Sequence, residues 1–179
     1  EINVDYSNKI YYFDKTVYDK RICDYYGKEN PSSELVLGPN IKPWPDMPEL
    51  TDSILVKVVT YITDAVTTTD EIIPSGETSS YRSNPVKLAE FTLGRKDPNY
   101  VSHAKKIQAY EIARENGENP ANIHELKSVF DSRRKSDGFS GISRMEIGIG
   151  STVYGNEPGG GSAREQAACC QRVLGTCPN

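Results

Sequence analysis

The sequence predicts an α/β fold, and three observations taken in chain order support this class. Residues 53–62 form a nearly continuous run of apolar and β-branched side chains, which is typical of a strand buried on both faces. Residues 97–134 carry apolar side chains at helical spacing. Residues 139–175 combine an alternating apolar stretch with the start and stop signals of a helix. A strand, a helical middle, and a strand followed by a capped helix fit an α/β domain.

Residues 1–50 differ from the rest because tyrosines cluster among charges and prolines follow them. We predict an extended arm here, with one short strand near Lys9–Phe13 and Trp44 holding the arm in place. The aromatic side chains should pack on something, either on this domain or on another domain of a longer protein. We therefore divide the chain into an arm or linker, residues 1–50, and a domain, residues 51–179.

A polar loop, residues 63–76, follows the predicted strand and carries three consecutive threonines and Asp70. Loops at strand ends often hold binding sites, although a local threonine or Asx turn explains the same composition. Further along, Asn84 and Pro85 give the N-cap and first position of a helix reaching about Leu93. Arg82 therefore stands just before a helix N-terminus.

Two longer helices are predicted to cover the sheet, one from Asp97 to about Asn116 and one from Pro120 to about Arg134. Their charges indicate solvated faces. His103 and His124 lie on polar stretches of these helices, so we expect surface residues rather than metal ligands. One or two strands should follow within residues 139–154.

Three glycines, Gly159–Gly161, precede Ser162 and Glu165, which have the spacing of a capping box. The pattern predicts a helix over residues 163–174. Glycines allow close backbone approach, and free N–H groups at a helix start attract anions. Arg164 adds a forked cation that suits a carboxylate or phosphate, although it could equally be an ordinary surface side chain.

The predicted helix should stop at Gly175, in the C′ position. The chain ends soon afterwards, whereas an α/β unit normally continues into a further strand. We therefore expect a domain truncated at its C-terminus.

Composition and cysteine spacing exclude several classes of function. A formal net charge of -4 gives no support for nucleic-acid binding, and no apolar run reaches the length of a membrane helix. No signal peptide is visible. The four cysteines lack a Cys-x-x-Cys pair, so we expect no metal bound by this chain and a cytoplasmic location. These cysteines are Cys23, Cys169, Cys170 and Cys177.

Four segments, in this order along the chain, resemble the C-terminal swivel domain of aconitase-family hydro-lyases. They are Ile54–Val58, Thr68–Asp70, Arg82 and Gly161–Glu165. The resemblance covers about residues 50–175 and is closest to the bacterial aconitase-like hydratases. It implies a swivelling β/β/α domain with a mixed sheet covered by helices.

The resemblance also implies a role for each matching residue in a dehydration and rehydration of a hydroxy di- or tricarboxylic acid. Ser162 matches the catalytic base, and Asp70 matches an aspartate of the active-site loop. Arg82 and Arg164 match arginines that bind substrate carboxylates. In this family a [4Fe–4S] cluster on other domains acts as Lewis acid, so the chain would need a cluster-bearing partner domain and would be inactive alone.

The chain departs from the family motif Gly-Ser-Ser-Arg-Glu-His at two positions. Gly161, Ser162 and Arg164 match, but Ala163 replaces the second, substrate-binding serine, and Gln166 replaces the histidine. A lost hydroxyl donor can cost about 3 kcal/mol of barrier, so the departure counts against standard citrate–isocitrate isomerisation but leaves a related hydration open. A non-catalytic di- or tricarboxylate-binding module and an inactive fragment stay open as alternatives.

Overall fold

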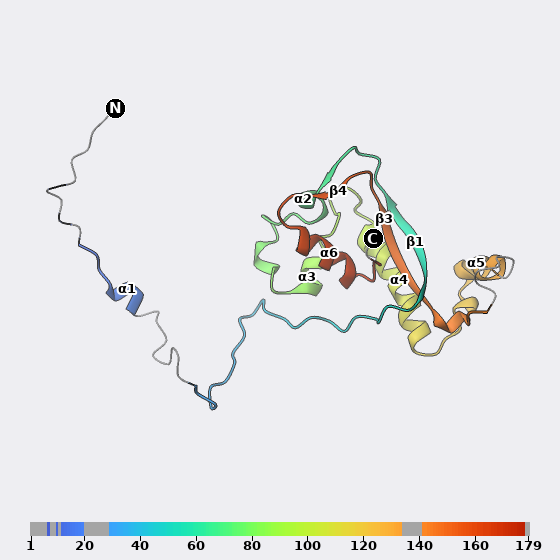
Figure 1. Cartoon of the computed structure of the whole chain (residues 1–179), viewed down its shortest axis with the longest axis horizontal. Helices are drawn as coiled ribbons and strands as arrows, with labels where there is room; N and C mark the ends of the chain where they lie inside the picture. The colour runs from blue at the N-terminus through green and yellow to red at the C-terminus, as the bar shows by residue number, and fades with distance from the viewer. Residues whose placement is uncertain (1–6, 8–9, 11, 20–28, 134–140, 178–179) are drawn as a thin grey trace. The chain divides into compact units, whose positions relative to one another are not determined.

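The computed structural model of the chain describes residues 7, 10, 12–19, 29–133 and 141–177 (Figure 1). The chain divides into two compact units, Glu1–Val36 and Leu37–Asn179. This division falls earlier in the chain than the predicted end of the arm. Within the second unit, the Lys42 amide donates to Ser83 O at 2.8 Å, so part of the predicted arm packs on the domain.

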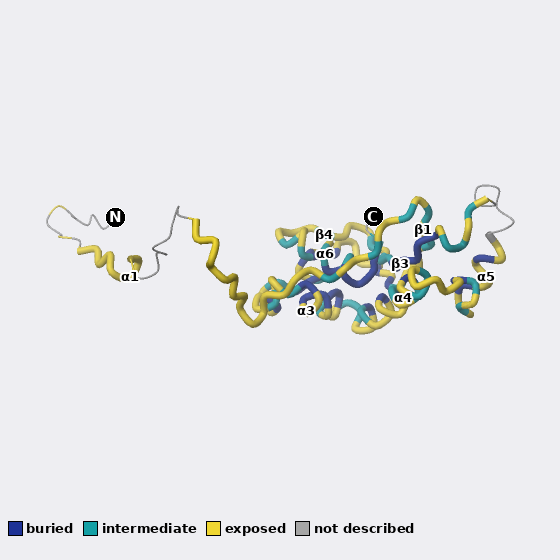
Figure 2. The backbone as a smooth tube through the Cα atoms, turned by 90° about the horizontal axis from the view of Figure 1, so that it is seen from below, coloured by how far each residue is buried: buried dark blue, intermediate teal, exposed yellow. Residues whose placement is uncertain are grey.

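In the first unit, the described secondary structure is one turn of helix, α1 (Thr16–Asp19), with no buried residue (Figure 2). The Asp14 carboxylate accepts the Thr16 amide at 2.9 Å and starts this turn. The short strand predicted near Lys9–Phe13 is not found at Ile10, Tyr12 or Phe13. Lys9 and Tyr11 lie outside the described residues.

The second unit contains both helices and parallel strand pairs, which confirms the coarse α/β class. In chain order its elements are β1 (Ser53–Tyr61), β2 (Thr67–Thr68), α2 (Thr69–Ile72), η1 (Ser79–Tyr81), α3 (Pro85–Ala89), α4 (Tyr100–Glu115), η2 (Pro120–Asn122), α5 (His124–Arg133), η3 (Arg144–Glu146), β3 (Ile147–Tyr154), β4 (Pro158–Gly160) and α6 (Arg164–Val173).

Strand β1 pairs in parallel with β3, at the position predicted for a strand (Figure 1). Its side chains alternate: Leu55 and Val59 pack into a cluster with α4 and β3, whereas Ile54, Val56 and Val58 are 37%, 41% and 53% exposed. The predicted burial on both faces is therefore wrong. Helix α4 packs on one face of the pair, and the described residues leave the other face accessible.

Two clusters of buried side chains form the core, and Figure 2 shows buried backbone in α3, α4, α6 and β3. One cluster joins α2, α3, α6 and the start of α4, and the other joins α4, α5 and β3. The most buried members are Ile73, Ala89, Leu93, Tyr100 and Ala104 in the first and Ile107, Phe130, Ile147 and Ile149 in the second.

Glu111 and Arg114 form a buried ion pair that fixes β3 to α4. The Glu111 carboxylate accepts from Arg114 at 2.6 and 2.8 Å and from the Ile149 amide at 2.8 Å. The Arg114 guanidinium also donates to Met145 O, just before β3. The two side chains are only 6% and 10% exposed, so water can solvate their charges little. The hydrogen bonds within the protein therefore satisfy these charges.

Helix α3 begins as predicted, with Pro85 in its first position and the Asn84 side chain accepting the Lys87 amide at 3.1 Å. It ends at Ala89, earlier than predicted. The chain then turns, and Leu93 adopts a positive φ of 54°. A continuous helix through Leu93 is impossible with this backbone conformation.

Helix α4 begins at Tyr100 rather than at Asp97. The Asp97 carboxylate accepts the Asn99 amide at 2.9 Å and the Thr60 hydroxyl at 2.6 Å, which holds residues 97–99 in a turn. Even this helix of 16 residues is polar, and no described helix is long and apolar enough to cross a membrane.

The remaining predicted elements are found with shifted bounds. The helix predicted from Pro120 is split into η2 and α5, and the strand region 139–154 gives η3 and β3. Phe139 and Ser140 lie outside the described residues. His103 and His124 are exposed, as expected.

Gly175 ends α6 in the predicted C′ position, with a φ of 75°. Its amide donates to Arg172 O and the Thr176 amide donates to Gln171 O, both at 3.0 Å, which is the Schellman pattern. A Cβ at Gly175 would lie 2.9 Å from the Gln108 side chain. Both the backbone conformation and the contact with α4 therefore require glycine here.

After α6 the chain returns to the side of β3. Ser151 forms a parallel bridge with Thr176, and the Cys177 amide donates to Ser151 O at 3.0 Å. The Thr176 hydroxyl lies 2.8 Å from the Tyr100 hydroxyl and 3.0 Å from that of Ser151, in the core. Strand β3, helix α6 and this bridge therefore follow the β-α-β order of a parallel sheet.

Candidate functional site

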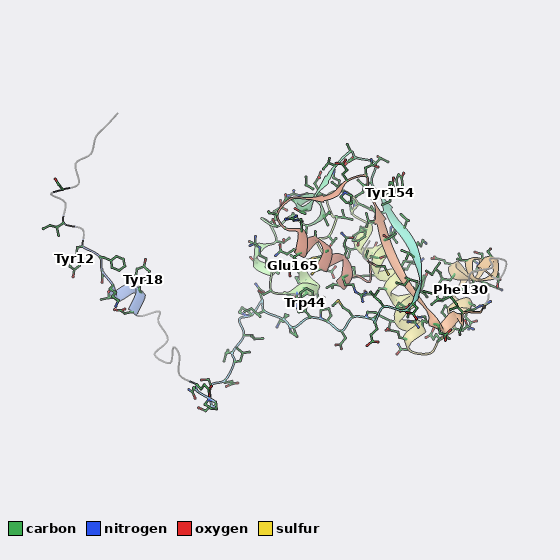
Figure 3. The ribbon with its side chains drawn as sticks, viewed as in Figure 1. Tyr12, Tyr18, Trp44, Phe130, Tyr154 and Glu165 are labelled. Atoms are coloured by element: carbon green, nitrogen blue, oxygen red, sulfur yellow. The ribbon has the colours of Figure 1, made fainter. Side chains whose placement is uncertain are left out.

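The two segments that carry the predicted site residues begin at the same edge of the sheet. Tyr61 and Tyr154, the last residues of β1 and β3, are paired, and their stacked ring centroids lie 4.4 Å apart. Figure 3 labels Tyr154 at this edge. Because the strands are parallel, both following loops leave from their carboxyl ends. This is the edge at which open α/β sheets usually bind ligands.

The two loops then pair with each other through β2 and β4. Thr67 lies opposite Pro158 and Thr68 opposite Gly160, and the Thr67 amide donates to Glu157 O at 3.0 Å. This second parallel pair brings the threonine-rich segment beside the glycine-rich segment. The sequence predicts both segments but gives no sign that they touch.

Gly161 lies directly against Thr69 at the end of this pair. A Cβ built at Gly161 would be 2.1 Å from Thr69 Oγ1 and 3.3 Å from Thr69 Cβ, so no side chain fits without movement. Its φ of 146° is also one that other residues rarely adopt. The backbone at Gly161 therefore approaches the Thr69 side chain closely, while its approach to a ligand stays a prediction.

The capping box predicted at Ser162 is wrong. Helix α6 begins at Arg164, and its N-cap is Ala163, which makes no side-chain hydrogen bond to the helix. Ser162 is exposed and stands one residue too early to cap. Because Gly161 is fixed against Thr69, the chain enters the helix later than the Ser162–Glu165 spacing implies.

A capping box is found instead at α2, in the threonine-rich loop. The Thr68 amide donates to the Glu71 carboxylate at 2.8 Å, and the Glu71 amide donates to the Thr68 hydroxyl at 3.3 Å. The local threonine turn that the composition of this loop suggests is therefore present, and Thr68-x-x-Glu71 has the spacing of its capping box. It sets the backbone around Asp70.

Lys96 bridges Glu71, within this turn, and Asp64, which precedes it. Its ammonium lies 2.7 Å from Glu71 Oε1 and 2.5 Å from Asp64 Oδ2. The hydrogen bond from Lys96, with those from Thr68, lowers the pKa of Glu71 to about 2. No sequence signal marked Lys96, because its partners lie far from it along the chain.

Asp70 and Arg82 are connected through Ser75. The Ser75 amide donates to Asp70 Oδ1 at 3.2 Å, and Arg82 Nη2 donates to Ser75 O at 3.4 Å. Asp70 also lies 3.5 Å from Arg95 Nη1. Both predicted residues are exposed, so this arrangement places them near each other at the protein surface.

Two cavities lie on either side of α6, and they separate the two predicted arginines. Arg164 lines a cavity of about 260 Å³ that also contacts β2, α2 and β4. Arg82 lines a smaller one of about 160 Å³, together with Trp44 and Glu165 (Figure 3). Ser162 and Asp70 line neither cavity. The structure therefore places Arg82 and Arg164 at different cavities and leaves Ser162 and Asp70 at the surface outside both, so the four predicted residues do not share one pocket.

The described thiols are not arranged to hold a metal. Cys169, Cys170 and Cys177 are unpaired, and no group of three or more His, Cys, Asp or Glu in the described ranges is placed to bind an ion. Burial raises the pKa of Cys170 to about 12, so this thiol stays protonated at neutral pH. The predicted iron–sulfur cluster concerns a separate domain and is not tested by this observation.

Comparison with known proteins adds no assignment. No protein-family model, curated protein or solved structure matches the chain. The functional assignment therefore depends on the motifs themselves and on the way the two loops meet.

Proposed function

We propose that this chain is the swivel-domain part of an aconitase-like hydro-lyase, which removes water from and adds water to a hydroxy di- or tricarboxylic acid. The observation that carries the proposal is the β2–β4 pair. It joins the segment leading to Asp70 with the segment leading to Ser162, at the carboxyl ends of β1 and β3. Site residues are commonly held on loops at this edge of a parallel sheet.

In this proposal Ser162 accepts the proton from the substrate carbon. A serine hydroxyl is a weak base at its ordinary pKa, so the adjacent cations and the start of α6 must stabilise its alkoxide. Arg164 has no ion-pair partner among the described residues and is available for a substrate carboxylate. Arg82, which the resemblance assigns to a second carboxylate, lines a different cavity from Arg164, and Asp70 positions the loop through Ser75.

The iron–sulfur cluster belongs to a separate domain in this proposal and supplies Lewis-acid chemistry at the substrate hydroxyl. The described residues offer no ligand group for it, so the chain's own part is limited to proton abstraction and carboxylate binding. Ser162 is exposed, and closure of a cluster-bearing domain over it would exclude water. The chain alone is expected to have no hydratase activity.

The test is a hydration assay on protein in which this chain is joined to its cluster-bearing domain. Ser162→Ala should lower kcat by about 10²- to 10⁴-fold, which is the usual contribution of a general base. Ser80→Ala, another exposed serine but outside the two loops, is the matched control and should keep full activity. Normal turnover by Ser162→Ala would remove the base assignment.

A non-catalytic module that binds di- or tricarboxylates is the second candidate, and the exposure of Ser162 favours it. Ala163 supports it further, because the second hydroxyl of the family motif is missing. Under this candidate the chain alone binds tricarballylate in calorimetry, Ser162→Ala binds equally well, and the joined protein shows no hydration activity.

The swivelling β/β/α fold and a cytoplasmic location belong to the same proposal. The parallel β1–β3 pair with α4 on one face supports the fold.

A further inference from the structure

One edge of the β1–β3 pair has no further strand beside it among the described residues. Strand β3 has neighbours on both sides, because it pairs with β1 and its Ser151 bridges to Thr176 (Figure 1). Strand β1 pairs with β3 alone within the described part of the chain, so its other side is a free edge. It is nine residues long, and a long exposed edge is a surface on which another polypeptide can pair.

The hydrogen bonds of β3 show the direction of its backbone groups. The Ser151 amide donates to Gly175 O at 3.3 Å, and Ser151 O accepts from the Cys177 amide at 3.0 Å. Both backbone groups of Ser151 therefore point away from β1. Because successive residues of a strand direct these groups to opposite edges, those of Gly150 point toward β1.

This direction identifies the residues of β1 whose backbone groups reach the free edge. Gly150 lies opposite Val56 in the parallel register. In a parallel pair, a residue that faces its partner strand bonds to the two neighbours of the residue opposite, so the N–H and C=O of Val56 point to the free edge. The same alternation applies to Ile54 and Val58. Three residues of β1 thus offer backbone donors and acceptors to a further strand.

These three residues also carry exposed apolar side chains. Ile54, Val56 and Val58 lie on the face of β1 that α4 does not cover, whereas Leu55 and Val59 pack toward α4. A strand added at the free edge would place every second side chain beside the exposed ones. Apolar cross-strand pairs on this face would stabilise the added strand.

On the α4 side, the free edge borders a cavity with excess positive charge. The cavity has a volume of about 290 Å³ and is lined by residues of β1 and α4, among them Lys57, His103 and Lys106. Both lysines pair with one carboxylate, that of Glu125, which lies 3.6 Å from the Lys57 ammonium. Two ammonium groups thus share a single negative charge, although the whole chain has a formal net charge of -4. An acidic side chain complements this cavity.

We propose that a separate polypeptide binds β1 as an added strand in which apolar and acidic side chains alternate. Its backbone pairs with the three outward-pointing residues of β1, and its apolar side chains lie beside theirs. Its acidic side chains lie on the α4 side, at Lys57 and Lys106. Because the side chains of a strand alternate between its faces, this composition matches both faces of β1 at once.

A second copy of the chain matches this edge less well. Two β1 strands paired antiparallel about Val56 would make their Lys57 side chains diagonal neighbours, about 7–8 Å apart on one face. Each copy would bring two lysines and one carboxylate to that face, so self-pairing would add to the excess positive charge. An acidic strand is therefore favoured over self-pairing.

The experiment titrates the 179-residue chain with a labelled peptide of alternating valine and glutamate, about seven residues long, and follows fluorescence anisotropy. A peptide with lysine in place of glutamate should bind at least about ten-fold more weakly. A glutamate peptide N-methylated at two successive central residues has both edges blocked and should not bind. Equal binding of the N-methylated peptide would overturn strand pairing, and equal binding of the lysine peptide would overturn the acidic preference.

Variants of β1 test the edge itself. Val56→Pro removes an outward-pointing donor, and proline is tolerated on an edge strand in this orientation, so the chain should fold but lose the glutamate peptide. Val56→Ala keeps the donor and should bind nearly as tightly as the wild type. Lys57→Glu should bind the lysine peptide more tightly than the glutamate peptide. Lys105→Gln, which changes a lysine of α4 outside the cavity, should leave both affinities unchanged.

Hydrogen exchange gives a readout that needs no variant. The amides of Val56 and Val58 should exchange fast in the chain alone and become protected when the glutamate peptide is added. The amides of Leu55 and Lys57, which face β3, should be protected in both states. Unchanged exchange at Val56 with saturating peptide would show that β1 is not the binding surface.

Two further outcomes would also overturn the proposal. If sedimentation shows a dimer of the chain that Val56→Pro dissociates, β1 pairs with a second copy instead. If the glutamate peptide does not bind at all, the edge does not accept an added strand. Neither result bears on the proposed hydratase function, because Val56, Lys57 and Lys106 line neither cavity beside α6.

Discussion

The contact between Gly161 and Thr69 gives the sharpest prediction, because it holds the two loops of the candidate site together. Gly161→Ala introduces a Cβ that would lie 2.1 Å from Thr69 Oγ1, far inside van der Waals contact. Thr69 is 3% exposed and β-branched, so its side chain has little room to rotate away. The substitution must therefore move the backbone of one loop.

Two costs add in this variant. Overpacking of this kind destabilises by about 1–3 kcal/mol. The φ of 146°, which suits glycine, adds about 1–3 kcal/mol for alanine. We expect the free energy of unfolding to fall by at least about 2 kcal/mol, which corresponds to a lower Tm by about 4–8 °C for a protein of this size.

Thermal and urea unfolding followed by circular dichroism measure this loss. Gly160→Ala is the matched control, because a Cβ at Gly160 meets no atom within 4 Å, and it should cost much less. In the double variant Gly161→Ala with Thr69→Ala the clashing oxygen is gone. It should be at least about 1 kcal/mol more stable than the sum of the two single changes predicts. Equal stability of the Gly160 and Gly161 variants would refute the close contact.

The remaining predictions concern charge. Glu111→Gln removes the counter-ion of the largely buried Arg114 guanidinium and should lower the free energy of unfolding by about 3 kcal/mol. Urea titration measures this loss. The control Glu125→Gln, in the exposed pair with Lys106, should lower the free energy of unfolding much less. Glu71 has a pKa lowered to about 2 in the folded chain, from an ordinary value of 4.5, by its hydrogen bond from Lys96. Its stabilising contribution is therefore complete above about pH 4.5 and is lost as the pH falls toward 2. Acid titration of wild type and Glu71→Gln should show that this part of the pH dependence is missing in the variant; identical acid profiles would contradict the pairing.

Local signals predicted several elements well, because they depend on neighbouring residues alone. Asn84 before Pro85 started a helix, Gly175 ended one, and the β-branched run of residues 53–62 formed a strand. In each case the cap, the allowed φ or the side-chain shape acts within a few residues. The Thr68-x-x-Glu71 capping box belongs to the same class and could have been read from the sequence.

Burial and helix starts were less predictable where a distant segment decides the outcome. The apolar run of β1 gave no indication that Ile54, Val56 and Val58 would be exposed, since this depends on which face α4 covers. The spacing of Ser162 and Glu165 predicted a capping box that fails because Gly161 is held by Thr69. Both outcomes come from contacts between segments far apart in the chain.

By itself the sequence determined the α/β class, the order of most elements and the residue types on which the proposed acid-binding site depends, since propensity, capping and charge are local properties. Only the tertiary structure decided that the two loops meet through β2 and β4, and that Arg82 and Arg164 face separate cavities across α6. The physical reason is that long-range pairing and packing fix where a side chain can reach. Residue type fixes only what the side chain can bind once it is there.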